Sequence, residues 1–257
     1  MASFAVKGTR IGEGRPKTVV SIMGATTNEL VDQAETAVVA GADCVEWRAD
    51  FARNVDDPQA MALTARELSE VLAATPLLFT FRSKGQGGQL ALEPRSYEKL
   101  NRAVLDSGAI DLLDVELCAG EALVRKLVGA AHEHGARAVV SHHDFTGTPS
   151  AETMTELLQT MASMGADVAK LAVYAHDVRD CLRLMDATEQ ARQRLDVVLL
   201  TIAMGKAGAL SRLCGQAVGS ALTFCSLGTP SAPGQVSLAQ ATRVLDELDA
   251  VFAVGNE

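Results

Sequence analysis

Eight short apolar segments recur along this chain, and helix-like segments separate them. They are TVVSIM (18–23), CVEWRA (44–49), LLFTFR (77–82), DLLDVEL (111–117), RAVVSHH (137–143), DVAKLAV (167–173), DVVLLTI (196–202) and SALTFCS (220–226). Their starts lie roughly 24 to 34 residues apart, the length of one strand plus one helix. Nearly continuous apolar strands indicate a parallel sheet that helices cover. Eight such units predict a closed (β/α)8 TIM barrel, and an open doubly wound sheet is the alternative.

The segments between the strands have helical signatures. Apolar residues from Met154 to Met164 follow helical spacing, and Ser150 is the predicted N-cap of that helix. The glycines that precede four of the strands, as expected of helix C-caps, are Gly41, Gly108, Gly135 and Gly165. Residues 1–17 precede the first core strand, and we expect them to form a short hairpin or cap over the bottom of the barrel. Because no linker interrupts the series, we expect a single catalytic domain over residues 1–257.

Composition excludes several classes of function. The chain is 48% hydrophobic and has a formal net charge of −9, which favours a soluble globular protein and argues against a nucleic-acid partner. The opening stretch MASFAVKGTRIGEG lacks the apolar core of a signal peptide, and no apolar run is long enough to span a membrane. The scattered cysteines, interpreted as reduced core residues of a cytoplasmic protein, are Cys44, Cys118, Cys181, Cys214 and Cys225.

Polar residues gather at the predicted strand ends. They are Glu46, Arg48, Arg82, Asp114, Glu116, Ser141, His142, His143 and Lys170, and the last two strands are followed by Lys206, Arg212, Ser231 and Gln235. In a barrel the carboxyl ends of the strands form the active-site face, so these side chains are expected to meet. Each also has a structural interpretation, since Glu46 and Arg48 could form a buried pair and one of the two histidines could lie on the surface.

Lys170 lies in the middle of an apolar strand, GADVAKLAVYA. Its stem could be buried while its ammonium reaches the surface. Alternatively, low dielectric and neighbouring cations favour a neutral amine, which attacks a carbonyl and forms a Schiff base. A nearby histidine can move protons at neutral pH, and arginines bind carboxylate or phosphate. Histidine and cysteine spacing suits no metal, and nucleotide motifs are absent, so we predict a metal-free Schiff-base lyase for a small acid with a ketone.

The chain resembles the type I 3-dehydroquinate dehydratases. The matching stretches are EWRAD (46–50), LLFTFRS (77–83), DVEL (114–117), SHHDFTGTP (141–149), GADVAKLAV (165–173), SR (211–212) and SAPGQ (231–235). The resemblance implies a (β/α)8 barrel, a homodimer, no cofactor, and syn loss of water from 3-dehydroquinate to give 3-dehydroshikimate in the shikimate pathway.

The resemblance also implies roles for individual residues. Lys170 falls at the Schiff-base position and His143 at the general acid/base position. The positions that correspond to substrate contacts are Ser21, Glu46, Arg48, Arg82, Arg212, Ser231 and Gln235.

Gln86 departs from the family pattern, in which a glutamate holds the catalytic histidine. Glutamine can still donate or accept a hydrogen bond at the imidazole, but it has no charge to favour the imidazolium, so we expect a lower pKa for His143 than is usual in the family. Gln86 lies in a glycine-containing loop, and residues 83–93 are expected to act as a lid over the site.

Two other functions stay open. A Schiff-base aldolase acting on a small keto acid could use the same barrel, although Arg212, Ser231 and Gln235 suit a carboxylate better than a phosphate. A non-catalytic barrel that binds a small acid is the second alternative, and Gln86 is the only residue that favours it.

Overall fold

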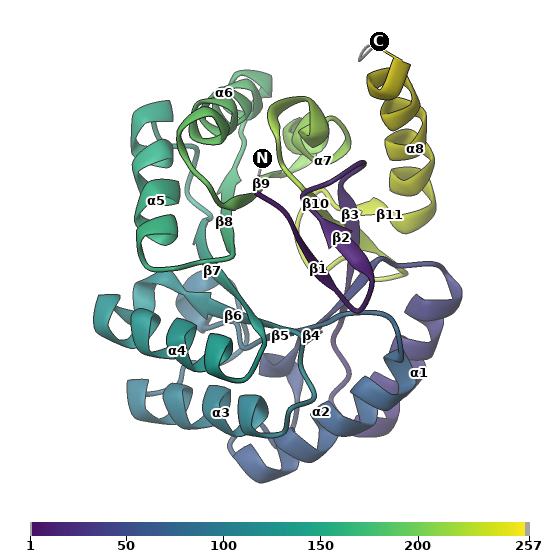
Figure 1. Ribbon diagram of the computed structural model, residues 1–257, viewed down its shortest axis with the longest axis vertical. Coiled ribbons are helices and arrows are strands. Elements are labelled where there is room, and N and C mark those ends of the chain that lie inside the picture. The colour runs from purple at the N-terminus through teal and green to yellow at the C-terminus, as the bar shows by residue number, and fades with distance from the viewer. Residues whose placement is uncertain (1, 255–257) are drawn as a thin grey trace.

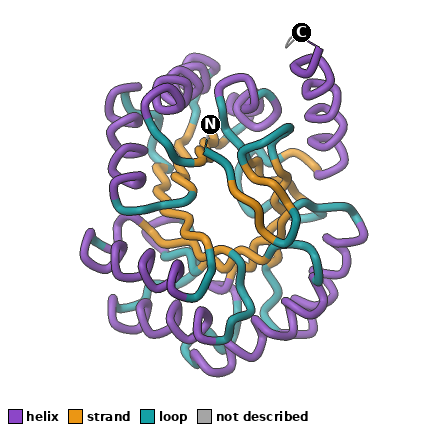
Figure 2. The backbone as a smooth tube through the Cα atoms, viewed as in Figure 1, coloured by secondary structure: helices purple, strands orange, loops and turns teal. Residues whose placement is uncertain are grey.

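The computed structural model describes residues 2–254, and it confirms the eight predicted strands as one parallel sheet. They are β3 (Lys17–Ile22), β4 (Cys44–Arg48), β5 (Leu77–Thr80), β6 (Leu112–Glu116), β7 (Arg137–Asp144), β8 (Val168–Tyr174), β9 (Val198–Met204) and β10 (Leu222–Ser226). Strands β3 to β9 pair with their neighbours in chain order, and β10 pairs with β3. Figure 2 shows these strands as a ring inside a shell of helices.

Helices follow the strands and lie outside them (Figure 1). They are α1 (Thr27–Val39), α2 (Pro58–Leu72), α3 (Pro94–Asp106), α4 (Glu121–Glu133), α5 (Ala151–Ser163), α6 (Val178–Arg194), α7 (Ala209–Leu213) and α8 (Leu238–Val254). The short 3-10 turns are η1 (Ala49–Phe51), η2 (Lys84–Gln86), η3 (Leu117–Ala119), η4 (Lys206–Gly208) and η5 (Gly215–Val218).

The barrel closes between β9 and β10. A parallel bridge joins Leu199 to Ser220, and the Ala221 amide donates to the Leu199 carbonyl at 2.8 Å. At the carboxyl end, the short strand β11 (Val236–Ser237) pairs with β10. The closed barrel is therefore confirmed, and the alternative of an open sheet is wrong.

The predicted helix signals form as expected. The Ser150 hydroxyl accepts a hydrogen bond from the Thr153 amide at 3.1 Å and caps α5. The four predicted C-cap glycines all adopt positive φ, for example 79° at Gly41 and 89° at Gly165, a conformation that a side chain would strain. These caps end each helix close to the start of the next strand.

The N-terminal hairpin closes one end of the barrel. Strands β1 (Phe4–Val6) and β2 (Thr9–Ile11) pair antiparallel, and the hairpin crosses the near end of the ring in Figure 1. Ile11 is fully buried and packs in one apolar cluster with residues near the amino ends of the strands, including Val19 and Cys44. The predicted cap is confirmed, and the hairpin covers the amino end of the barrel.

Two other predictions concern the burial of the cysteines and the absence of a membrane-spanning segment. Cys44, Cys181 and Cys225 are buried and free as expected, whereas Cys118 is exposed and Cys214 only partly buried, so the interpretation of all five as core residues is wrong. Within residues 2–254, no helix is long and apolar enough to cross a membrane.

Candidate active site

A pocket opens at the carboxyl end of the barrel, where the sequence predicted the functional face. The predicted residues that line it are Glu46, Arg48, Arg82, Gln86, His143, Lys170, Arg212, Ser231 and Gln235. They come from strands and loops spread along the whole chain, and the barrel brings them together because all strand ends meet at one rim. Ser21 is not a lining residue and contacts the pocket through Glu46.

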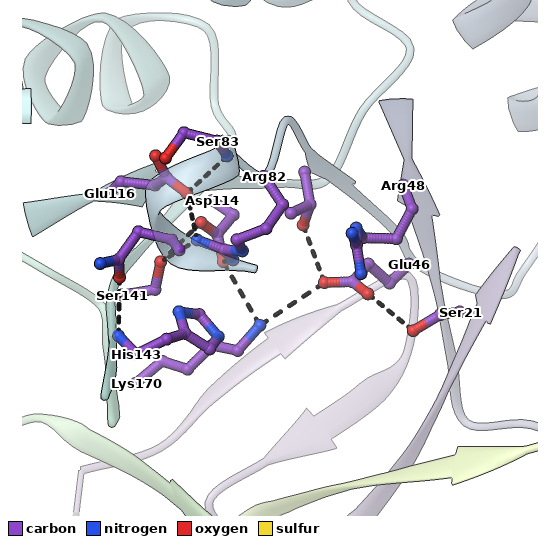
Figure 3. Close-up of polar contacts among 12 residues, drawn as sticks. Ser21, Glu46, Arg48, Arg82, Ser83, Asp114, Glu116, Ser141, His143 and Lys170 are labelled. Carbon is purple, nitrogen blue, oxygen red and sulfur yellow. Dashed lines mark hydrogen bonds and ion pairs between the residues drawn. The ribbon is translucent and has the colours of Figure 1, made fainter. Parts of the chain in front are cut away.

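Lys170 projects from β8 into the pocket and is only 4% exposed. Its Nζ lies 3.5 Å from Glu46 Oε1 and 3.4 Å from Asp114 Oδ2 (Figure 3), and 4.3 Å from the centre of the Phe224 ring. The interpretation in which the ammonium reaches the surface is therefore wrong. The expectation of a nearby cation is confirmed, because Arg82 Nη2 lies 2.8 Å from the same Asp114 oxygen, although the ion-pair partners of the lysine are carboxylates.

Two pocket arginines are already held by acids. Arg48 donates from Nε and Nη2 to the two carboxylate oxygens of Asp50, each at 2.8 Å, so the possible pair with Glu46 does not form. Arg82 donates at 2.8 Å to both Asp114 and Glu116. These fixed pairs orient both guanidinium groups, and they leave little charge free to attract an anion.

Asp114 is the centre of the buried network in Figure 3. Besides Arg82, it accepts a hydrogen bond from the Ser141 hydroxyl at 2.7 Å and contacts Lys170. Burial alone would raise the pKa of this carboxyl, but the positive charges of Arg82 and Lys170 outweigh burial and lower it. Asp114 therefore stays ionised and balances the cations that surround it.

Arg212 differs from the other two pocket arginines. It is 1% exposed, and its hydrogen bonds go to the backbone carbonyls of Phe224 and Pro233. Its Nε is buried without a hydrogen-bond partner among residues 2–254, and no carboxylate pairs with it there. Burial lowers the pKa of this guanidinium to about 10. A buried cation without a counterion is the pocket's natural binding point for an anion.

A chain of hydrogen bonds links the loop after β10 to the lysine. Gln235 Nε2 donates to the Ser231 hydroxyl at 2.8 Å, which donates to the Ser21 hydroxyl at 3.1 Å. Ser21 in turn donates to Glu46 Oε2 at 2.7 Å, while Glu46 Oε1 contacts Lys170. The loop is thereby tied across the mouth of the barrel to the ion pair at its centre.

His143 is the histidine of the pair that faces the pocket, while His142 is half-buried and does not line it. Burial, followed by the positive charges of Arg82 and Lys170, places the pKa of His143 well below its ordinary value of 6.5. This shift is relative to an ordinary histidine, and a pKa lower than is usual in the family stays a prediction. Gln86 Oε1 accepts from the main-chain amide of His143 at 2.7 Å, so the expected hydrogen bond to the imidazole is not formed.

Several functional neighbours were not assigned from the sequence. Asp50, Asp114 and Glu116 hold the pocket arginines, and the two-residue spacing of Asp114 and Glu116 was the visible signal for the latter pair. Nothing in the sequence pointed to Phe145, whose ring stacks on that of His143.

The closed barrel and its pocket, with a buried lysine, a neutral histidine and an unpaired arginine, define the class of (β/α)8-barrel enzymes that act on small anionic molecules. Residues 18–251 match the model of the type I 3-dehydroquinase family, and the chain belongs to that family.

Relatives of known name cover nearly the whole chain. The 3-dehydroquinate dehydratase of Lactiplantibacillus plantarum is 41% identical over 246 residues, which are 96% of this chain and 98% of that protein. The 3-dehydroquinate dehydratase of Salmonella agona is 40% identical and covers 95% of this chain and 98% of its own length.

Solved structures show the same agreement. The type I 3-dehydroquinate dehydratase of Clostridium difficile, solved with covalently modified comenic acid, has a TM-score of 0.94 at 37% identity and covers 98% of this chain and 100% of its own. The 3-dehydroquinate dehydratase of Geobacillus kaustophilus also has a TM-score of 0.94 at 37% identity, with 96% of both chains covered.

Proposed function

We propose that this chain removes water from 3-dehydroquinate to give 3-dehydroshikimate through an imine on Lys170. Family membership and the names of the relatives support the reaction. The observation that carries the mechanism is the place of Lys170, buried between Glu46 and Asp114 in a pocket that also holds His143 and Arg212.

The lysine activates the substrate. Its ammonium first gives up a proton to Glu46, the contacting carboxylate other than Asp114, and this proton later leaves with the water that the adduct loses. The amine then attacks the ketone carbon, and loss of water from that carbon leaves an iminium. The iminium withdraws electrons from the adjacent carbon and makes its C–H bond acidic. The carboxylates of Glu46 and Asp114 then stabilise the positive charge of the iminium.

His143 moves the proton in both directions. Its imidazole is neutral because its pKa is low, so it can accept the proton from the carbon next to the iminium. The resulting imidazolium then donates this proton to the hydroxyl on the following carbon, which leaves as water while the double bond forms. Hydrolysis of the imine returns the ketone and the free lysine.

Arg212 supplies the binding charge. Because it is buried and has no carboxylate partner among residues 2–254, it is the guanidinium that the substrate carboxylate neutralises. Ser231 and Gln235 lie on the loop beside it and offer neutral donors. Arg48 and Arg82 then help to position the substrate and add positive potential to the pocket, since carboxylates already pair with them.

Chemical trapping tests this function directly. The enzyme is incubated with 3-dehydroquinate, reduced with borohydride and analysed by intact mass and peptide mapping. We expect an adduct on Lys170, and absorbance of the conjugated enone during turnover, which an aldolase or a binding barrel would not produce. Lys170→Ala should lose the adduct and several orders of magnitude in rate. Lys206→Ala is the control, because Lys206 is exposed and does not line the pocket as the sequence suggested. Near-normal turnover by Lys170→Ala would refute the mechanism.

The histidines provide a second test. His143→Ala should still form the imine but stall at elimination, so that the covalent adduct accumulates without product. His142→Ala should cost far less, because its side chain does not line the pocket. Equal losses in the two variants would contradict the role of His143.

Five further parts of the proposal rest on the chain's family and sequence pattern. They are homodimeric assembly, a cytoplasmic location, a single catalytic domain over 1–257, lid movement of residues 83–93 and independence from any cofactor. Sedimentation of the purified protein tests the dimer, and turnover after exhaustive dialysis against chelator tests the independence from a metal.

A further inference from the structure

Phe145 lies over the histidine of the pocket. It follows β7, and its ring is nearly parallel to that of His143, with 6.2 Å between ring centres and an interplanar angle of 14°. The ring lines the pocket although 41% of the residue is exposed. Offset stacking at this distance is a favourable arrangement of two flat rings.

The Phe145 ring packs directly against Gly87. It ends η2 with a φ of 86°, and a Cβ atom built on it would collide with Phe145 Cζ. Only glycine combines this backbone conformation with such a close approach of an aromatic ring. The neighbouring Gln86 accepts a hydrogen bond from the His143 amide. The segment Gln86–Gly87 therefore supports His143 in two ways. Gln86 accepts from the His143 main-chain amide, and Gly87 leaves space for the Phe145 ring that stacks on the imidazole.

The imidazole has no hydrogen bond that fixes its orientation within residues 2–254. Its Nδ1 is fully buried and without a partner there, so Nε2 is the nitrogen that can reach a molecule in the pocket. A general base must be held within hydrogen-bond reach of the proton that it takes. Without a partner at Nδ1, packing against Phe145 is the contact that keeps the ring in place.

We propose that Phe145, seated on Gly87, is a positioning residue that holds the His143 ring in its reactive orientation and keeps water away from it. The proposal rests on the acid/base role of His143 given above. In this proposal Gln86 holds the main chain of His143 through a hydrogen bond, and Gly87 leaves space for the Phe145 ring.

Burial and the charges that face His143 determine how its pKa should change when the Phe145 ring is removed. Arg48 from β4, Arg82 after β5 and Lys170 from β8 are cations that disfavour the imidazolium, and His142 acts in the same sense. Burial is the largest cause of the low pKa of His143, and Phe145 contributes to that burial. Removing its ring admits water, so the pKa of His143 should rise towards 6.5, while the cations still hold it below that value.

The experiment titrates the imidazole of His143 by NMR in the ligand-free full chain, with the resonance assigned by its loss in His143→Ala. We expect Phe145→Ala to raise the pKa of His143 and to lower kcat by between about tenfold and about a hundredfold through misplacement of the base. Phe145→Leu, which keeps an apolar cover, should stay closer to the parent protein in both measurements.

Gly87→Ala provides an independent variant, because it displaces the Phe145 ring without removing it. It should reproduce the titration shift of Phe145→Ala, and the double variant should show no additional shift. A general loss of structure would also move the pKa of His143 towards 6.5, so melting curves first establish that each variant is folded under the conditions of the titration. If Gly87→Ala does not fold, Phe145→Ala and Phe145→Leu still decide the question.

An unchanged pKa of His143 in Phe145→Ala would overturn the proposal. This result is distinguishable from failure of the reaction mechanism, because the titration is measured without substrate. Conversely, if Lys170→Ala kept its activity, the imine would be wrong while the titration would still report whether Phe145 covers the histidine.

Discussion

At the residue scale, the three pocket arginines differ in whether a carboxylate pairs with them. Arg48 and Arg82 are held by buried carboxylates at 2.8 Å, whereas among residues 2–254 Arg212 donates to backbone carbonyls. A buried charge is either paired within the protein or stays energetically costly until a charged ligand pairs with it. Arg212 is the second case, and its lowered pKa of about 10 still leaves it protonated at neutral pH.

Arg212 should therefore dominate substrate binding. We expect Arg212→Ala to weaken binding by about 2 kcal/mol or more, as for loss of one partner of a buried charge pair. Arg212→Lys should recover only part, since an ammonium lacks the two-pronged geometry of the guanidinium. Calorimetry with 3-dehydroquinate in a Lys170→Ala background measures binding without turnover. The exposed Arg243→Ala is the control, and unchanged affinity in Arg212→Ala would move the carboxylate to Arg48 or Arg82.

Gln86 lets a single charge be placed beside His143. Gln86→Glu keeps the acceptor for the His143 amide and adds a negative charge, so it should raise the pKa of His143. The base form of His143 is lost as pH falls through its pKa, so the acid limb of kcat/KM lies below pH 6.5 in the parent and moves to higher pH in Gln86→Glu. Gln89→Glu, with the same charge on the exposed part of the loop, is the control. A limb that stays in place would show that the charge at residue 86 does not act on His143.

At the element scale, each β/α unit depends on caps that end one element and start the next. Ser150 begins α5 a few residues after β7, the strand that carries His143. Ser150→Ala should cost about 1 kcal/mol in the free energy of unfolding, because the Thr153 amide loses its acceptor. Ser150→Asp keeps an acceptor and should stay near the parent value. Urea denaturation measures both, and equal stability of the alanine variant would mean that water replaces the cap without cost.

At the scale of the whole molecule, the barrel has one end for stability and one for chemistry. The hairpin β1–β2 closes the amino end with Ile11, and the pocket occupies the other end. Ile11→Ala should lower the free energy of unfolding by about 2–5 kcal/mol through loss of packing and creation of a cavity.

The same variant should leave KM for 3-dehydroquinate unchanged, since Ile11 itself does not line the pocket. The neighbouring Arg10, which is exposed and pairs with Glu13, provides the control Arg10→Ala, which should change stability by less than about 0.5 kcal/mol. Denaturation curves together with steady-state kinetics check both statements, and a change in KM of Ile11→Ala would contradict the separation of the two ends.

The sequence by itself determined the barrel, the hairpin and most of the polar residues that meet in the pocket. Strand and helix periods, glycine C-caps and the Ser150 cap are local signals, so they can be read without knowledge of the fold. Once eight strands are assigned, the rule that their carboxyl ends share one rim brings Lys170, His143 and Arg212 together.

Only the tertiary structure decided which partner each of these residues has. Arg48 pairs with Asp50 rather than with Glu46, and Lys170 contacts the carboxylates of Glu46 and Asp114. Gln86 accepts from the main chain of His143 and not from its ring. These choices depend on distances of a few ångströms and on side-chain directions between segments far apart in the chain. No local pattern encodes such distances, because packing of the whole barrel sets them.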